Sequence, residues 1–306
     1  MGGIQSKKQD MAICFVFFNP SKSKRILMNY LYTVNRLNEY PCYTIELVFD
    51  DRVPEIPASS KVFHVRSNSF MFHKERLCRV LESKIPKKYT KLVFIDADVI
   101  FSEANWYSQM SKKLNSFDVV QGFEFAHWLD LTYKNVLLTR ETVIKTKGTV
   151  FSHAFHPGFV WGFTRKWYKK AGFFDWAVSG SGDTLSVAAW MKLRFEKGFH
   201  SLPMSMKALY EDFSTMKKPK ISYLEDIHVF HLYHGSRVNR QYVDRHKLLN
   251  IPNDIQTLLK LNKQGVYEWV EPHKWNPKLL TYFNTRDDDG VEVLDLATEE
   301  VYKVAS

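Results

Sequence analysis

The stretch Lys91–Phe101, KLVFIDADVIF, decides the fold. Its uninterrupted apolar run, Leu92–Ile95, is typical of an interior strand in a sheet that is covered on both faces. Asp96 and Asp98 follow at a spacing of i, i+2, which places both side chains on the same side of an extended segment. Because open α/β sheets bind ligands at the carboxyl ends of their strands, we expect these carboxylates to converge on Mg²⁺ or Mn²⁺ held against a phosphate.

Apolar runs alternate with amphipathic segments along the first third of the chain. Strands are predicted at residues 11–18, 43–49, 61–65 and 91–95, and helices at residues 22–37 and 70–83. This β-α-β-β-α-β order predicts the α/β class, with a mainly parallel central sheet and short crossovers. Since no repeat or Gly/Ser linker divides the chain, we expect a flexible leader at residues 1–10 and a single domain over residues 11–250.

The second half of the chain carries weaker signals. Helices are predicted at residues 104–114, 165–170, 184–197 and 236–249, and strands at residues 119–120, 158–163 and 226–232. Residues 251–306 are expected to form a C-terminal helical extension. From Thr285 onward the extension is rich in Asp and Glu, which predicts a loosely docked or disordered acidic tail.

Composition limits the kinds of partner. The chain has 306 residues and a net charge of +10, which suits anionic partners such as nucleotide phosphates or acidic lipids. No RNA- or DNA-binding motif accompanies the charge, so nucleic acid is not an expected partner. Three cysteines with no C-x-x-C pair indicate a reducing compartment. With no signal-peptide pattern and no long apolar segment, a cytoplasmic location is expected.

The first eight residues, MGGIQSKK, fit the pattern for N-myristoylation, with Gly2 and Ser6 at the required positions. One acyl chain followed by two lysines would give reversible association with the cytosolic face of a membrane. The alternatives are a remnant of an expression vector or an ordinary disordered leader.

A late segment, His228–Tyr242, combines histidines with a turn and two arginines. A predicted strand ends at a Gly-Ser turn, where His234 can ligate a metal through its neutral imidazole. The predicted helix that follows offers free N–H groups to a diphosphate, and Arg237 and Arg240 add positive charge.

Two alternatives stay open for these histidines. A single histidine is often a hydrogen-bonded core residue. The two H-x-x-H spacings, together with His153 and His156, also allow a zinc site, although no cysteine ligand accompanies them.

A glycine-rich turn, Ser179–Thr184, presents Asp183 at the start of a predicted helix. Asp183 can act as the helix N-cap or as a general base for a hydroxyl acceptor, and both roles can hold together. Gly182 permits close approach of a substrate to the backbone. Trp161 and Trp176, which flank this region, can stack on a sugar ring.

Taken in order, these motifs resemble the nucleotide-sugar glycosyltransferases of the Rossmann-like GT-A fold, over most of residues 12–250. Residues 74–106, which include the D-x-D motif, look like the corresponding stretch of bacterial, phage and large-virus members. Residues 172–183 are similar to the acceptor region of galactosyltransferase-like enzymes. The segment His231–Gly235 resembles the late histidine segment that completes the metal site in this family.

The resemblance implies metal-dependent transfer from a nucleotide-sugar, most often a UDP-sugar, to a hydroxyl of a glycan or glycoprotein, with inversion. It implies that Asp96, Asp98 and His234 hold Mn²⁺ (or Mg²⁺), with His231 as the alternative to His234, and that Asp183 is the catalytic base. The implied donor-binding residues are Phe17, Asn19, Asp50, Lys74, Asp96, Gly235, Arg237 and Arg240. The implied acceptor-binding residues are His156, Trp161, Trp176 and Gly182.

Two other functions remain open. Residues 94–100 also fit the nucleophile motif of haloacid-dehalogenase-like phosphatases, with Asp96 and Asp98 as the acids. That family places the motif near the start of its domain and needs a later G-D-x-x-x-D, whereas here Val187 stands at the last position. A non-catalytic carbohydrate-binding protein would not need the paired acids and the late histidines.

Overall fold

The computed structural model describes residues 9–195, 203–241 and 244–290, and the predicted acylation site at Gly2 lies outside them. A seven-stranded sheet forms the centre of the molecule. Its strands, in order across the sheet, are β11 (Ile221–Tyr223), β6 (Val119–Gln121), β10 (Val160–Thr164), β4 (Lys91–Ile95), β1 (Met11–Phe18), β2 (Cys42–Phe49) and β3 (Val62–Ser67).

The central sheet is mainly parallel, as predicted. β1 pairs in parallel with β2 and β4, β2 with β3, and β6 with β11, whereas β10 runs antiparallel to both of its neighbours. In the β1–β4 pair, Phe15 lies opposite Ile95. The carboxyl ends of these two strands therefore meet at one edge of the sheet. The α/β class is thus confirmed.

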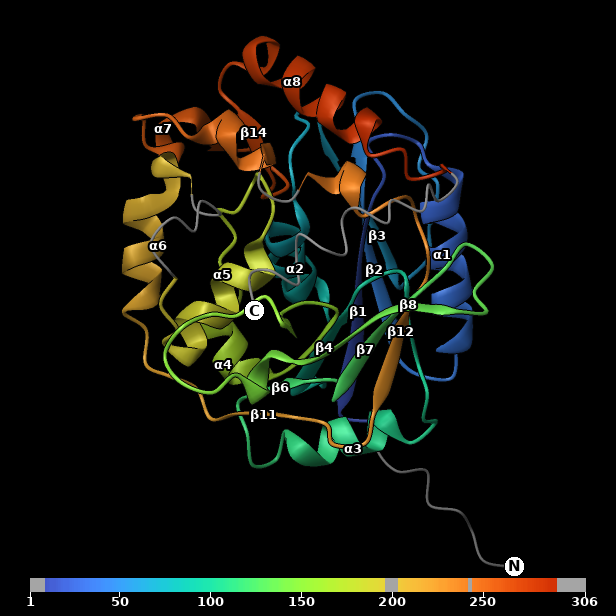
Figure 1. The fold of residues 1–306 in the computed structure, drawn as a ribbon. Helices are drawn as coiled ribbons and strands as arrows, with labels where there is room; N and C mark the ends of the chain where they lie inside the picture. Colours follow the sequence, from blue (N-terminus) through green and yellow to red (C-terminus); the bar gives the residue numbers. More distant parts are fainter. Residues whose placement is uncertain (1–8, 196–202, 242–243, 291–306) are drawn as a thin grey trace, which may run out of the picture.

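Both faces of the sheet are covered, because alternate residues of β1 enter two different hydrophobic clusters. Ala12 and Cys14 pack with side chains of α2, α4 and α5, whereas Ile13 and Phe15 pack with side chains of α1, α3 and the second sheet. In Figure 1, α1 and α2 lie on opposite sides of the central strands. These helices are α1 (Lys24–Arg36), α2 (Lys74–Lys84), α3 (Trp106–Lys113), α4 (Arg165–Lys170) and α5 (Gly182–Met191).

A second sheet of five strands lies against one face. Its order is β5 (Val99–Phe101), β12 (His228–His231), β7 (Phe125–Leu129), β8 (Val136–Thr142) and β9 (Phe155–His156). The antiparallel β5–β12 pair sets His231 opposite Val99, and Leu232 N donates to Asp98 O at 2.8 Å. This register brings the late histidines beside the D-x-D motif.

The C-terminal extension contains a strand pair as well as helices. Its elements are α7 (Ile255–Leu258), β13 (Leu259–Leu261), β14 (Tyr267–Trp269) and α8 (Pro272–Thr285), and Trp269 and Phe283 belong to the same cluster as α2 and α5. The remaining short elements are η1 (Val143–Lys145), η2 (Met204–Met206), α6 (Lys207–Ser214), η3 (Val238–Arg240) and η4 (Asp244–Leu249). No helix in the described parts of the chain is long and apolar enough to cross a membrane.

Three predictions of local structure are wrong. The helix predicted over residues 184–197 starts at Gly182 and ends at Met191, because Lys192 adopts a left-handed conformation with φ 60°. Asp183 therefore lies in the first turn, and Ser181 is the N-cap. The helix predicted over residues 236–249 is replaced by the short segments η3 and η4, and the left-handed Gln241 ends the first of them.

The third error concerns the residues after α8. Arg286–Gly290 were expected to be loosely docked, but Asp288 is only 4% exposed. Asp289 accepts hydrogen bonds from Arg25 N at 2.8 Å and Ser23 Oγ at 2.7 Å. A carboxylate at the N-terminus of α1 is stabilised by the free N–H groups and the helix dipole. The rest of the acidic tail, residues 291–306, lies outside the described residues.

Candidate active site

A cavity of about 550 Å³ opens at the carboxyl edge of the central sheet. Its walls come from the ends of β1, β4 and β12 and from the first turns of α2 and α5, which are far apart in sequence. The predicted residues among its lining are Phe17, Lys74, Asp96, Asp98, His156, Asp183, His234, Arg237 and Arg240.

At one end of this cavity, Asp98, His231 and His234 each bring a ligand atom within 4.8 Å of the others. Asp98 Oδ2 lies 2.8 Å from His234 Nε2 and 3.5 Å from His231 Nε2, and the two Nε2 atoms are 3.2 Å apart. Among the described residues no other group of His, Cys, Asp and Glu meets this spacing. The structure thus brings together both histidines that the sequence left as alternatives, without His153 or His156.

The chemistry of this group fits a divalent cation. The second carboxylate oxygen of Asp98, Oδ1, is buried and has no hydrogen-bond partner, so it is available as a further donor. Burial favours the protonated carboxyl, but His231, His234 and Arg240 together hold the pKa of Asp98 well below its usual range. Asp98 is therefore ionised, as a metal ligand must be.

Asp96, which was predicted to be a metal ligand, is not part of this group and pairs with Lys74, whose Nζ lies 2.5 Å from Asp96 Oδ1. Burial raises the pKa of Asp96 to about 6; Lys74 acts in the opposite direction and Asp98 in the same one. Burial alone would lower the pKa of Lys74, but the carboxylates of Asp96 and Asp183 raise it above its usual value. The structure therefore separates the two acids of the motif, one toward the histidines and one toward α2.

The other end of the cavity is rich in carboxylates. A Cβ at Gly158 would lie 2.6 Å from Asp183 Oδ2 and 3.2 Å from His156 Nε2, so these two side chains converge over a glycine. Burial lowers the pKa of His156 well below its usual value, which keeps the imidazole neutral. Its Nε2 is buried and has no hydrogen-bond partner. Asp183 Oδ1 accepts from Thr184 N at 2.7 Å, while Oδ2 faces Gly158.

Glu75, which follows Lys74 in the first turn of α2, also lines this end. A Cβ at Gly182 would lie 2.5 Å from Glu75 Oε1, so only glycine at this position leaves room for the carboxyl. Burial raises the pKa of Glu75 to about 7; Lys74 opposes this effect and Asp183 adds to it. Glu75 therefore shares one lysine with Asp96 and Asp183.

Several predicted binding residues do not line the cavity. Trp161 is 3% exposed and packs edge-on against Trp190, so its ring has no free face for a sugar. Trp176 is half-buried and packs against Tyr267 with ring centroids 4.7 Å apart.

The predicted binding residues near strand ends, Asn19, Asp50 and Gly235, belong to loops and turns and do not line the cavity. The side-chain amide of Asn19 bonds to Ser23 O at 2.8 Å and Glu55 Oε2 at 3.0 Å, and so it fixes the loop before α1. Asp50 is exposed and left-handed, with φ 50°. Gly235, with φ +82°, lies against the backbone of residues 286–288, where a Cβ would be 2.7 Å from Asp287 O.

Arginines supply the positive charge of the cavity. Besides the predicted Arg237 and Arg240, its lining includes Arg140, Arg245 and Arg286. Arg240 Nη2 lies 2.7 Å from His234 Nε2, and the Arg237 guanidinium lies 5.8 Å from the Trp128 ring. Such a group can bind a diphosphate, although no long helix begins at this turn.

Sequence reasoning missed Glu75 and Asp288. Glu75 was part of the Lys74–Arg76 stretch that carried the family resemblance, and it carries a raised pKa only because of folding. Asp288 lies 54 residues after the histidine that it contacts, inside a run of acids that resembles a solvated tail. No local pattern distinguishes it from Asp287 or Asp289.

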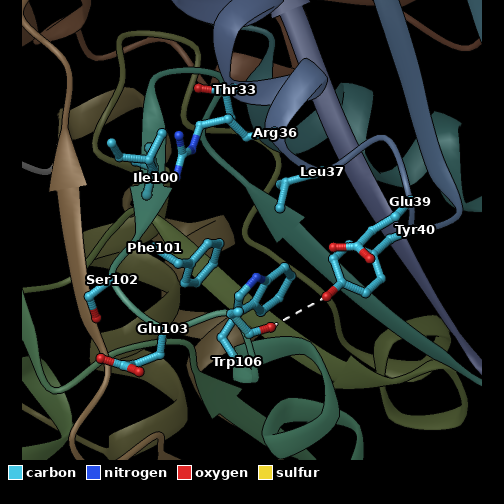
Figure 2. Close-up of a pocket in the computed structure, with 12 residues that line it drawn as sticks. Thr33, Arg36, Leu37, Glu39, Tyr40, Ile100, Phe101, Ser102, Glu103 and Trp106 are labelled. Atoms are coloured by element: carbon cyan, nitrogen blue, oxygen red, sulfur yellow. Dashed lines mark hydrogen bonds between the residues drawn. The ribbon is translucent and has the colours of Figure 1, made fainter.

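A smaller cavity of about 180 Å³ lies elsewhere, between the end of α1, β5 and the start of α3 (Figure 2). Phe101 and Trp106 stack there with ring centroids 3.9 Å apart, and the Tyr40 hydroxyl donates to Ala104 O at 3.4 Å. None of the predicted site residues lines it, so the larger cavity is the candidate active site.

No family model matches the sequence, and no curated protein matches it either. Among solved structures, the chain is similar to Drosophila beta-1,4-galactosyltransferase 7 in complex with manganese, UDP-galactose and xylobiose, at 9% identity and a TM-score of 0.40 over 85% of this chain and 92% of that chain. It is also similar to the galactosyltransferase LgtC, at 13% identity and a TM-score of 0.35 over 78% and 95% of the two chains. A third similar structure is a 4-diphosphocytidyl-2C-methyl-D-erythritol synthase from Anaerococcus prevotii, at 9% identity and a TM-score of 0.34 over 79% and 97%. At these values the function has to be argued from the cavity itself.

Proposed function

We propose that this protein is a metal-dependent glycosyltransferase that transfers a sugar from a nucleotide-sugar, a UDP-sugar, to a hydroxyl of a glycan or glycoprotein. One observation carries the proposal. A single cavity holds a metal-binding group with arginines at one end and a half-buried carboxylate, Asp183, at the other. Transfer from a diphosphate leaving group to a hydroxyl needs both halves within reach of one sugar.

The donor end of the cavity suits a nucleoside diphosphate. Asp98, His231 and His234 would hold the cation, and two imidazoles beside one carboxylate favour Mn²⁺ over Mg²⁺. When bound, the ion supplies Lewis-acid stabilisation of charge on the leaving diphosphate. Arg237 and Arg240 bind the phosphates. Asp96, oriented by Lys74, can accept a hydrogen bond from a ribose hydroxyl.

The acceptor end suits proton transfer. Asp183 Oδ2 accepts the proton of the acceptor hydroxyl, whose oxygen attacks the anomeric carbon as the bond from that carbon to the diphosphate oxygen breaks. A direct displacement of this kind inverts the anomeric configuration. Neutral His156 can hydrogen-bond the acceptor and orient it. A proton on Glu75, whose pKa is raised to about 7, relieves its repulsion with Asp183.

Calorimetry with UDP in the presence and absence of Mn²⁺ tests the donor half. We expect binding that needs the metal. Slow hydrolysis of UDP-galactose or UDP-glucose without an acceptor is expected as well. Hydrolysis of p-nitrophenyl phosphate in preference to these would favour the phosphatase alternative, and sugar binding without UDP binding would favour a non-catalytic lectin-like role.

Acylation at Gly2, with reversible membrane association, stays a separate prediction from the sequence. Mass spectrometry of the N-terminus after expression in a eukaryotic cell tests it, with Gly2→Ala as the matched control. An unmodified N-terminus in the parent protein would dismiss the idea.

A further inference from the structure

The described part of the C-terminal acidic segment reaches the metal-binding group. Asp288 Oδ1 lies 3.2 Å from Nδ1 of His234, the ring nitrogen opposite the one that faces Asp98. Asp288 is 4% exposed. Its Oδ1 also accepts from Arg286 Nη2 at 2.9 Å. The carboxylate is therefore held at a fixed place behind the imidazole.

We infer that Asp288 is the positioning residue of the metal centre: it accepts the Nδ1–H of His234 and thereby directs Nε2 toward Asp98 and the cation. A neutral imidazole has one donor and one acceptor nitrogen, and the partner of one nitrogen determines the role of the other. Carboxylates behind metal-bound histidines fix the tautomer and ring orientation in this way. The inference rests on the metal half of the proposed function.

The same contact distinguishes the two histidines. Each ring nitrogen of His234 faces a carboxylate, Asp98 at 2.8 Å from Nε2 and Asp288 at 3.2 Å from Nδ1. Arg240 Nη2 lies 2.7 Å from Nε2 and 2.8 Å from Nδ1, and with the proton of the ring on Nδ1 the guanidinium donates to Nε2. The contacts of His231 Nε2 to Asp98 and His234 are 3.5 Å and 3.2 Å long. Its ring packs flat against Phe159, with centroids 5.0 Å apart. His234 is therefore the better oriented ligand, and His231 contributes more through packing.

Hydrogen bonds to the start of α1 hold the segment in place on the far side of Asp288. Asp289, the next residue, accepts from Lys24 N at 3.1 Å and Arg25 N at 2.8 Å at the start of α1. On the near side, Gly235 lets the backbone of residues 286–288 approach the turn after His234, where a Cβ would lie 3.0 Å from Asp288 Cα. We call residues 286–290 the C-terminal strap. It joins α1 to the histidine turn and carries Asp288 between them.

Mn²⁺ titration of the full chain, without nucleotide, tests the inference by electron paramagnetic resonance of the free ion. Asp288→Ala is expected to weaken Mn²⁺ binding by about 10- to 100-fold. Asp288→Asn keeps an acceptor oxygen and is expected to recover most of that loss. Asp289→Ala loosens the strap without touching His234, so it is expected to lower the melting temperature with a smaller effect on affinity. Asp287→Asn, at an exposed neighbouring acid whose left-handed backbone, with φ 47°, asparagine also tolerates, is the matched control.

The outcomes separate the inference from the function on which it rests. If the parent protein binds no Mn²⁺, the metal half of the proposed function fails. If the parent binds Mn²⁺ and Asp98→Ala does not, but Asp288→Ala binds as the parent does, only the inference is overturned. Equal losses in Asp288→Ala and Asp289→Ala would also overturn it, because strap docking would then explain the effect.

A second measurement does not depend on whether Asp288→Ala folds. Nitrogen-15 NMR of the histidine rings in the Mg²⁺-saturated parent reports which nitrogen carries the proton, with His234→Gln to assign the signal. The expected state of His234 is a proton on Nδ1. A proton on Nε2 would contradict the role assigned to Asp288.

Discussion

The two ends of the active-site cavity handle charge in opposite ways. At the metal end, each carboxylate has at least two partners: Asp98 contacts His231 and His234, and Asp288 contacts His234 and Arg286. These partners lower the pKa values of both acids. Around Lys74, by contrast, the carboxylates of Asp96, Glu75 and Asp183 share one lysine. Burial raises the pKa of Asp96 to about 6 and that of Glu75 to about 7.

This difference teaches how one cavity can serve two kinds of chemistry. Acids with low pKa values stay ionised and can bind a cation or support its ligands. Asp96 and Glu75, which are buried beside one lysine, have raised pKa values and so can exchange protons near neutral pH. The four predictions below test this division, from the largest expected effect to the smallest.

Asp98→Ala should abolish Mn²⁺-dependent UDP binding with little loss of fold, because the residue is the only carboxylate in the metal-binding group. The matched control is Asp96→Ala, two positions away in the same motif. Because Asp96 pairs with Lys74, this control should weaken UDP binding but retain Mn²⁺ binding. Calorimetry measures both. Unchanged UDP affinity of Asp98→Ala in Mn²⁺ would show that the cation binds elsewhere.

Asp183→Asn should lower turnover by at least about a hundredfold, since loss of general-base help typically costs about 10²–10⁴ in rate. The amide keeps the shape of the side chain and can still accept from Thr184 N, so the melting temperature should stay near that of the parent. UDP-sugar affinity of the same variant serves as the control. Transfer at the parental rate would show that Asp183 is not the general base, and the role proposed for the acceptor end would be wrong.

His234→Ala should weaken UDP binding in Mn²⁺ by roughly tenfold or more, but hardly at all in EDTA, because only the metal-dependent part of the binding is lost. His231→Ala should have a smaller effect on binding and a larger one on the melting temperature, since its ring packs against Phe159. Calorimetry and thermal unfolding measure the two effects. Exchanged phenotypes would reverse the assignment of the better oriented ligand.

Glu75→Gln should change the pH dependence of stability more than it changes activity. The folded-state pKa of Glu75 is raised from 4.5 to about 7. Between these values the folded protein holds a proton that the unfolded chain has released, so this group's contribution to stability falls as pH rises through the window. Glu75→Gln removes that fall and should raise the melting temperature at pH 8 relative to the parent. Glu103→Gln, at an exposed acid, is the control that should leave the profile unchanged.

The parts of the fold that were predictable are those with a local signal. The run Leu92–Ile95 lies in a wholly buried strand, and α4 spans residues 165–170 as predicted, because both depend on the residues' own periodicity. The segment after His234 was predicted to be one helix, but Gln241 takes a left-handed conformation with φ 45° there. Residues 236–249 contain no glycine or proline that would have indicated the break.

The site was predictable where a strand end carried the chemistry. Asp98 and His234 could be named from their place after apolar runs, and the strand register then brought them together. Trp161 has the chemistry of a sugar platform but is buried, because alternation along β10 directs its ring toward α5, where it meets Trp190. The partnership of His234 with Asp288 depends on tertiary docking alone, which periodicity does not encode.

The C-terminal strap has a consequence for how the protein is made. The metal-binding group consists of Asp98, His231 and His234, and the C-terminal strap that contacts it begins only at Arg286. A ribosome delivers these residues in that order, so a nascent chain can form its central sheet long before the strap leaves the exit tunnel. Competence to hold a metal is therefore expected late in synthesis. A chain that stops short of Asp288 would have the sheet and most of the cavity walls, but its cation would be held loosely.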